Sequence, residues 1–343
     1  MTRAAIVGAS GYAGAELIRI LHTHPDIELG VIAAGSNAGA TLASVHPQFS
    51  GVPELANVVF AATEPSALTD CDLIFMALPH GESAALVAQL PAGVRIVDLG
   101  ADFRLGDASA WEKYYGGTHA GQWTYGLPEI HGNRAKIASE SRVANPGCYA
   151  TAVQLALAPL FADKLVETND VIVVAASGTS GAGRSAKVNL LGSEVMGSMS
   201  TYKVGGTHQH TPEIEQSLTA VAGQDVQLNF TPMLAPMSRG ILATVSVKTA
   251  ASETQLRDSL KKYFTEEPFV TVLPTGQLPV TASTYGSNAA HIQVAKDDRM
   301  GRATVIVAID NLVKGAAGQA VQNANIMLGL HEASGLSAIG VAP

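Results

Sequence analysis

The stretch "VGASGYAG", residues 7–14, constrains the fold of this 343-residue chain more than any other feature. It follows the apolar run "RAAIV" and opens "GYAGAELIRIL", whose apolar residues recur at helical spacing. Glycines between a strand and a helix let backbone N–H groups approach a pyrophosphate at the helix N-terminus. The spacing is G-x-x-G-x-x-G rather than G-x-G-x-x-G, and such a turn can also serve helix–sheet packing alone. Its position predicts a dinucleotide site that includes Gly8, Ser10, Gly11, Tyr12 and Gly14.

The first half of the chain alternates short apolar runs with helical stretches. Runs such as "IELGVIAAG", "CDLIFMALP" and "GVRIVDLG" are apolar nearly throughout, which is typical of buried parallel strands. Between them, "GYAGAELIRILHTHP" and "GESAALVAQLP" show helical spacing of apolar residues. This alternation indicates right-handed βαβ units, so we expect a Rossmann-type doubly wound parallel sheet of the α/β class.

The end of the second expected strand indicates which dinucleotide binds. NAD sites usually place Asp or Glu there to hold the ribose 2′-hydroxyl. Here the strand ends in Gly35, Ser36 and Asn37, and Glu28 lies at its other end. Because no carboxylate repels a 2′-phosphate, the sequence favours NADP over NAD, with Ser36 and Asn37 as phosphate contacts.

The second half has longer, more β-branched runs, such as "DVIVVAASG" and "RGILATVSVKT". They predict an α+β domain with a mixed or antiparallel sheet and helices on one face. The last segment, "NLVKGAAGQAVQNANIMLGL", is expected to form one long helix that returns to the first domain. We therefore expect an NADP-binding domain of residues 1–147 and 311–343, and a catalytic and oligomerisation domain of residues 148–310.

Charge and cysteine usage exclude several classes of protein. A net charge of −8 argues against nucleic-acid binding. Two cysteines, Cys71 and Cys148, cannot build a disulfide framework, so a reducing compartment is expected. No apolar run approaches the roughly 20 residues that span a bilayer, and the first residues lack a signal-peptide layout. The protein is expected to be cytoplasmic and not bound to membranes.

Cys148 lies in "ANPGCYATA", between a tight turn and an expected helix. A helix N-terminus favours negative charge, so this position is expected to lower the pKa of the thiol and to expose the sulfur for nucleophilic attack. The alternative is that a small residue merely fits the turn. Cys71, at the start of "CDLIFMALP", is expected to be a buried core residue.

Two histidines, His208 and His210, precede an expected helix in "GGTHQHTPEIEQ". Zinc is disfavoured, because no cysteine or third histidine lies near and Glu213 would have to reach from the helix; no metal site is expected. A histidine is well suited as an acid and base beside a thiol. A further loop, "AASGTSGAGRSAK", follows a strong strand, so its residues Ser177, Gly178 and Gly181 are expected near the cofactor or the substrate.

Eight stretches, in order along nearly the whole chain, resemble the N-acetyl-γ-glutamyl-phosphate reductase family, a relative of aspartate-semialdehyde dehydrogenase. They are "GASGYAGAELIRIL", "ALPHG", "DLGADFRL", "YGLPEI", "ANPGCYATA", "SGTSGAGR", "HQHTPEI" and "PMSRGILAT". Cys148 together with "HQHTPEI" separates the chain from the aspartate enzyme. The chain differs from the family's pattern at "GSNAG", where relatives often have a basic residue that assists NADP binding.

The resemblance implies a reaction of arginine biosynthesis: NADPH-dependent reduction of N-acetyl-γ-glutamyl phosphate to N-acetylglutamate 5-semialdehyde, with release of phosphate. The Cys148 thiolate would form a thioester, since a thiolate attacks well and leaves well. His208 is the expected acid–base group, and His210 is expected to bind the substrate and is the reserve for the acid–base function. Arg104 and Arg239 are the best candidates for binding the anionic substrate, with Arg184 third; surface ion pairing is the alternative for each.

The resemblance also implies contacts with the nicotinamide end of the cofactor and an oligomer. Pro79 of "ALPHG" is expected at the cofactor, and Asn311 of "IDNLVKGAAGQA" is expected at the carboxamide or as the N-cap of the final helix. Relatives associate through the second domain, so a homodimer or homotetramer is expected.

Three alternatives remain beside this hypothesis. In the first, the chain is a dehydrogenase of the same architecture that acts on aspartyl phosphate. In the second, it is a non-catalytic NADP-binding regulator in which Cys148 is structural. A cysteine hydrolase would need the thiol and the imidazole but no dinucleotide turn, and "VGASGYAG" argues against it.

Overall fold

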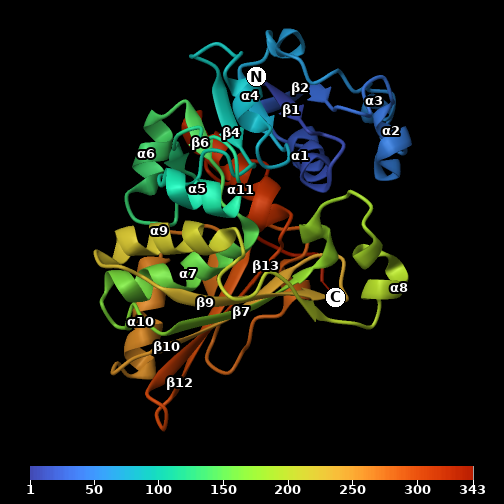
Figure 1. The fold of residues 1–343 in the computed structure, drawn as a ribbon. Coiled ribbons are helices and arrows are strands. Elements are labelled where there is room, and N and C mark those ends of the chain that lie inside the picture. Colours follow the sequence, from blue (N-terminus) through green and yellow to red (C-terminus); the bar gives the residue numbers. More distant parts are fainter. Residues whose placement is uncertain (343) are drawn as a thin grey trace.

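Six parallel strands form the first sheet of a computed structural model that describes residues 1–342 (Figure 1). They lie in the order β2-β1-β3-β4-β6-β5, and every neighbouring pair is parallel. The predicted doubly wound parallel sheet is therefore confirmed. Its strands are β1 (Thr2–Val7), β2 (Ile27–Ala33), β3 (Leu73–Met76), β4 (Arg95–Asp98), β5 (Thr124–Tyr125) and β6 (Arg142–Ala144).

Alternate residues of β1 enter two different hydrophobic cores, because successive side chains of a strand point to opposite faces. Ala4 and Ile6 pack in the core that holds α1 (Tyr12–His22). Ala5 and Val7 pack in the core that holds α4 (Ser83–Val87) on the other face. Burial on both faces is why these strands are apolar nearly throughout.

Seven strands form the second sheet, in the order β11-β12-β13-β10-β7-β9-β8. The pairs β11–β12 and β7–β9 are parallel and the others are antiparallel, so the sheet is mixed, as the sequence predicted. Its strands are β7 (Val171–Gly178), β8 (Ser200–Thr201), β9 (Leu228–Ala235), β10 (Ile241–Lys248), β11 (Val270–Val272), β12 (Ala290–Asp297) and β13 (Arg302–Ile309).

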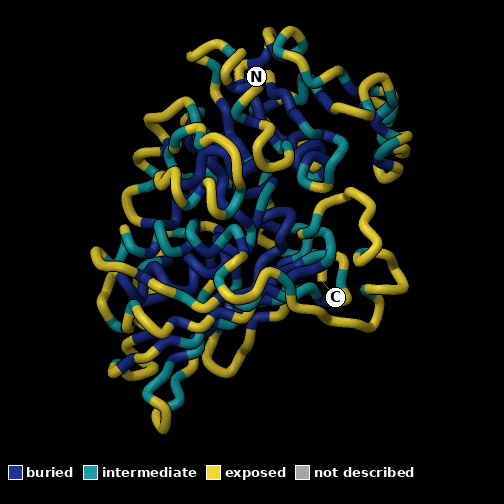
Figure 2. The backbone as a smooth tube through the Cα atoms, viewed as in Figure 1, coloured by how far each residue is buried: buried dark blue, intermediate teal, exposed yellow. Residues whose placement is uncertain are grey.

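The helices of the second half share a core with one face of the mixed sheet. They are α7 (Cys148–Ala162), α9 (His210–Ala222) and α10 (Glu253–Tyr263). Side chains alternate between buried and more exposed along β7 and β10, and the other face leaves Ile172 and Val174 exposed. Figure 2 shows buried residues in both the upper and the lower half of the molecule, where the two sheets lie.

The final helix differs from the single long helix that the sequence predicts. A π-helical turn, Val313–Ala317, comes first, and α11 (Gly318–Met327) follows it. The Asp310 carboxylate accepts the N–H groups of Leu312 and Val313, which starts the turn. The turn and α11 then pack in the core of the first sheet, where Figure 1 shows α11 in red.

The remaining helices are short and lie mainly in the first half. They are α2 (Leu42–Val45), α3 (Pro53–Ala56), α5 (Ala108–Tyr114), α6 (Asn133–Ser139) and α8 (Gly192–Val195). No helix within residues 1–342 combines the length and the apolar character needed to cross a membrane. The domain limits proposed from the sequence stay a prediction.

Candidate active site

Cys148 is the first residue of α7, just after the loop that leaves β6. Gly147 precedes it in extended backbone, with φ −72° and ψ 150°, and no side chain caps this end of the helix. The first N–H groups of a helix have no partners within the helix, so this end can hold a negative oxygen. Cys148 is half-buried, whereas Cys71 is buried in the core as predicted.

Asn145 fixes the turn before Cys148 through hydrogen bonds in three directions. Its N–H donates to the carbonyl of Asp98 (2.8 Å), and its side-chain Nδ2 donates to the carbonyl of Ala316 (3.1 Å). Its own carbonyl accepts from Nε of Arg104 (2.8 Å). The first sheet and the π-helical turn therefore both hold the start of α7 in place.

A buried carboxylate, Glu213 on α9, ties the same turn to Arg104. Its Oε1 accepts from the N–H of Gly147 (2.8 Å) and from the hydroxyl of Tyr125 (2.7 Å). Its Oε2 pairs with Nη1 of Arg104 at 3.2 Å, and both side chains are buried. These extra hydrogen bonds offset the cost of taking two charges out of water. A positive charge is thereby fixed beside the turn of Cys148.

His210 lies against that turn from the start of α9. A Cβ added to Gly147 would lie 2.3 Å from Nε2 of His210, so the glycine makes room for the imidazole. Burial lowers the pKa of His210 well below its usual value, and the nearby Arg104 lowers it further. The ring is therefore neutral at pH 7, although the same burial disfavours its protonated form.

His208 has a different environment. Its Nδ1 accepts the backbone N–H of His210 (3.0 Å), and its ring packs edge-on against Tyr149, Tyr202 and Phe230. Burial, with a contribution from His210, lowers the pKa of His208 to about 2. The choice of His208 as the acid–base group stays a prediction. The contact with Gly147 favours the reserve, His210.

The expectation that the helix terminus lowers the pKa of Cys148 is wrong for this structure. Burial raises the pKa of the Cys148 thiol to about 11, although the N–H of Tyr149 and the charge of Arg104 act in the opposite direction. Desolvation disfavours the thiolate by more than the helix end stabilises it. The thiol is therefore protonated at pH 7, and a base must remove its proton when it attacks.

Gly315, in the π-helical turn, packs directly on the nucleophile candidate. A Cβ added there would lie 2.7 Å from Cβ of Cys148. We expect Gly315→Ala to lower kcat by about 10²-fold, because a displacement of about 1 Å at a reacting atom costs that much. Steady-state kinetics measures it, and Gly51→Ala, where the added Cβ meets nothing within 4 Å, is the control. An unchanged kcat in a folded Gly315→Ala protein would contradict this packing role.

The glycine turn fits a dinucleotide pyrophosphate. Gly8 has φ +81°, and a Cβ on it would lie 2.3 Å from the carbonyl oxygen of Ala77; a Cβ on Gly14 would lie 2.6 Å from Cα of Ala9. Gly11 precedes α1, whose first turn has neither a side-chain cap nor an acidic residue. Its N–H groups are thus free to bind phosphate oxygens. Ser10 and Tyr12 belong to the same turn.

The other predicted cofactor contacts come from three further segments. Ser36 and Asn37 follow β2 in an exposed turn, and Pro79 follows β3. Ser177 and Gly178 end β7, and a Cβ on Gly181 would lie 2.9 Å from Oγ of Ser177. Parallel sheets bind ligands outside the carboxyl ends of their strands, which is where β2 and β3 place Ser36, Asn37 and Pro79.

The side chain of Asn311 is hydrogen-bonded to other residues of the protein. Its Oδ1 accepts from the N–H of Gly240 (2.7 Å), and its Nδ2 donates to Oγ of Ser180 (3.0 Å). Asp310, and not Asn311, accepts the first N–H groups of the final helical segment. The expected N-cap function of Asn311 is therefore wrong, and its contact with the cofactor stays a prediction.

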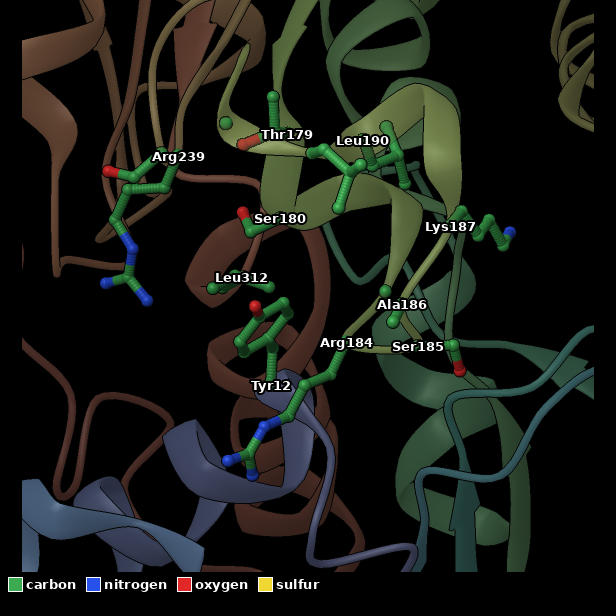
Figure 3. A pocket seen from close by; sticks show the side chains of 14 residues that line it. Tyr12, Thr179, Ser180, Arg184, Ser185, Ala186, Lys187, Leu190, Arg239 and Leu312 are labelled. Carbon is green, nitrogen blue, oxygen red and sulfur yellow. The ribbon is translucent and has the colours of Figure 1, made fainter. Parts of the chain in front are cut away.

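The three arginine candidates are not brought together. Arg104 lies close enough to Cys148 to influence the pKa of the thiol. Arg239 pairs instead with Glu16 of α1 (2.6 Å) and with Asp310 (3.3 Å). Arg184 contacts the glycine turn, and both of these arginines line the same cavity (Figure 3). Of the three, only Arg104 is placed beside the nucleophile candidate.

Sequence reasoning missed several residues that build this site. Glu213 was considered only as a zinc ligand, although its position three residues after His210 puts both on one face of a helix. Tyr125 and Gly315 carry no local signal, because each acts through residues that are far away in the sequence.

Two family models match the chain in turn. Residues 3–139 match the NAD-binding domain of semialdehyde dehydrogenases, and residues 148–311 match the dimerisation domain of semialdehyde dehydrogenases. Proteins named N-acetyl-γ-glutamyl-phosphate reductase are similar over nearly their full length. The one from Acidothermus cellulolyticus is 57% identical over 343 residues, and the one from Streptomyces coelicolor is 56% identical; each alignment covers 99% of both chains.

Solved structures of more distant proteins have the same fold. The aspartate semialdehyde dehydrogenase II of Vibrio cholerae, complexed with ASA, superposes with a TM-score of 0.72 at 16% identity over 96% of this chain and 98% of its own. The aspartate semialdehyde dehydrogenase of Candida albicans, solved with NADP, gives 0.71 at 15% identity over 96% and 99%. At these identities the likeness concerns the fold alone.

Proposed function

Since this chain belongs to the N-acetyl-γ-glutamyl-phosphate reductase family of semialdehyde dehydrogenases, we propose that it reduces N-acetyl-γ-glutamyl phosphate to N-acetylglutamate 5-semialdehyde with NADPH. Phosphate is released, and the step belongs to arginine biosynthesis. The observation that carries this proposal is Cys148 at an uncapped helix end, with the neutral imidazole of His210 against Gly147.

The first half of the reaction is acyl transfer to Cys148. Nε2 of His210 takes the proton of the thiol, and the sulfur attacks the acyl carbon of the substrate. The bond between that carbon and the phosphate oxygen breaks, which leaves a thioester and free phosphate. The N–H groups at the start of α7 stabilise the negative oxygen that forms on the acyl carbon. A base is needed because burial keeps the thiol protonated at pH 7.

The second half is reduction of the thioester. NADPH, when bound at the glycine turn, would supply the hydride for this reduction. His210, protonated in the first half, returns its proton as the carbon–sulfur bond breaks, so the aldehyde leaves and the thiol is restored. The glycine turn of residues 8–14 and the loops after β2, β3 and β7 hold the cofactor.

Arg104 is the group that we assign to the anionic substrate. The ion pair of its guanidinium with Glu213 (3.2 Å) and its hydrogen bond to the carbonyl of Asn145 (2.8 Å) fix its orientation at the turn before α7. The substrate carries a phosphate that leaves with extra negative charge, which a fixed guanidinium stabilises. Arg239 contributes less, because its ion pairs with Glu16 and Asp310 hold it at the start of α1 and not at the turn of Cys148.

We also infer that the chain forms a homodimer or a homotetramer through its second sheet. The open face of the mixed sheet leaves Ile172 and Val174 exposed, and an exposed apolar strand face favours association. Both cysteines are free, which supports a reducing compartment such as the cytoplasm.

The assay that tests this function runs the reaction in reverse. Phosphate-dependent reduction of NADP is measured with N-acetylglutamate semialdehyde and, in parallel, with aspartate semialdehyde. We expect activity only with the acetylated substrate, and higher catalytic efficiency with NADP than with NAD, because no carboxylate follows β2. Preference for aspartate semialdehyde would support the aspartyl-phosphate alternative. Absence of activity with both substrates, despite cofactor binding, would support the regulator.

A further inference from the structure

A cavity of about 530 Å³ lies between the start of α1 and the loop that follows β7 (Figure 3). Among the described residues that line it are three cationic side chains and no carboxylate: Arg184, Lys187 and Arg239. Hydroxyl groups also line it, from Tyr12, Thr179, Ser180, Ser185 and Ser238. Such a lining suits a ligand that carries negative charge and many oxygen acceptors.

Arg184 reaches out of the second half of the chain and onto the first. Its Nη1 donates to the carbonyl of Ser10 (2.8 Å), and its Nη2 donates to the carbonyl of Val45 (2.7 Å). Ser10 belongs to the glycine turn. Gly183 has φ +84°, a conformation that favours glycine, and it turns the chain just before Arg184. Figure 3 shows the guanidinium beside Tyr12, at the start of α1.

His46 connects Arg184 to Ala9, the residue before Ser10 in the glycine turn. Nε2 of His46 is 3.0 Å from the carbonyl of Ala9, and Nδ1 is 3.3 Å from Nη1 of Arg184. A carbonyl only accepts and a guanidinium only donates, so these partners assign the proton to Nε2. Burial lowers the pKa of His46, and Arg184 adds to the effect, so the ring remains neutral at pH 7. Two carbonyls of the glycine turn are thus held from outside it.

The charge of Arg184 is uncompensated, unlike that of the neighbouring arginine. Arg239 has carboxylate partners in Glu16 and Asp310. The partners of Arg184 are two carbonyls and a neutral imidazole, and the side chain is exposed. An exposed guanidinium without a carboxylate partner keeps its full charge, and its hydrogen bonds to Ser10 and Val45 hold that charge at the glycine turn.

We propose that Arg184 is a ligand of the pyrophosphate of the bound dinucleotide, supplied by the mixed-sheet half of the chain. This rests on the proposed function, because it needs a dinucleotide on the glycine turn. The guanidinium already contacts that turn, where a helix N-terminus and glycines bind pyrophosphate. Arg184 therefore binds the cofactor and not the substrate, for which the sequence proposed it. The bound cofactor would then contact residues of both halves of the chain.

Binding of NADPH and of NADH, followed by nicotinamide fluorescence without substrate, tests the proposal in Arg184→Gln. We expect both dissociation constants to rise by the same factor, roughly 10- to 100-fold, as for the loss of a charged hydrogen bond. Arg184→Lys, which keeps the charge, should recover part of the affinity. Arg299→Gln is the control, because Arg299 is an exposed arginine paired only with Asp297.

Each other result has a definite meaning. An unchanged dissociation constant in folded Arg184→Gln overturns the proposal. Weakened binding of NADPH alone moves the contact to the 2′-phosphate and overturns the pyrophosphate assignment. An equal loss of dinucleotide affinity in Arg184→Lys and Arg184→Gln would mean that Arg184 acts only through its hydrogen bonds to the carbonyls of Ser10 and Val45. That result would overturn the phosphate contact. A wild-type protein that binds neither dinucleotide rejects the proposed function itself, together with this inference.

Discussion

Replacing Cys148 by serine is expected to lower kcat by about 10³- to 10⁶-fold, the range in which loss of a catalytic nucleophile falls. A serine hydroxyl is scarcely ionised at neutral pH and lacks the nucleophilicity of sulfur. The variant should still fold and bind NADPH: Cys148 packs against the core of the second sheet, but serine is close to cysteine in size, and the glycine turn does not involve the sulfur. Steady-state kinetics and fluorescence titration measure the two properties. Cys71→Ala, in the core, should cost stability and little rate.

The covalent mechanism also predicts an intermediate that can be detected directly. Wild-type protein given the acyl phosphate without NADPH should gain the mass of one N-acetylglutamyl group on the peptide that contains Cys148. An adduct on Cys71, or none under trapping conditions, would rule out the thioester mechanism.

The pKa of Cys148 gives the same site a predicted pH dependence. Burial raises that pKa to about 11, so the thiolate fraction of the free protein should rise about tenfold per pH unit between pH 7 and pH 10. Alkylation of Cys148 by iodoacetamide should follow that rise. A plateau near pH 7 would show an activated thiolate in the resting protein and would contradict the need for a base.

His210→Asn is expected to lower kcat by about 10²- to 10⁴-fold, the usual contribution of general acid–base catalysis. The reason is its position: Gly147 leaves room for the ring beside the turn of Cys148, and the neutral ring has a nitrogen that can take the proton of the thiol as the sulfur attacks. The KM for substrate should change little, because an interaction made only in the transition state affects kcat.

His208→Asn is the matched comparison. His208 accepts the N–H of His210 through Nδ1, so an asparagine oxygen can keep part of that bond. We expect a smaller loss of kcat than in His210→Asn. A larger loss in His208→Asn, with both proteins folded, would return the acid–base function to His208, as the sequence alone proposed.

The fold follows from local patterns that a sequence displays directly. The glycine turn, the uniformly apolar strands of the first half and the β-branched strands of the second half each report on a segment of about ten residues. They predicted both sheets and located the turn before Cys148. The final helix was predicted less well, because the carboxylate of Asp310 and the packing on Cys148 impose a π-helical turn that no spacing of apolar residues reveals.

What the sequence determined by itself is the set of chemical groups: a cysteine at a helix start, two histidines before another helix, a glycine turn and three arginines. Tertiary structure decided which of them meet. Arg104, Gly147, His210, Glu213 and Gly315 come together from positions up to 211 residues apart, through a buried ion pair and two close glycine contacts. It also decided the sign of the pKa shift of Cys148, because desolvation depends on every neighbour that excludes water, and neighbours distant in sequence leave no local pattern.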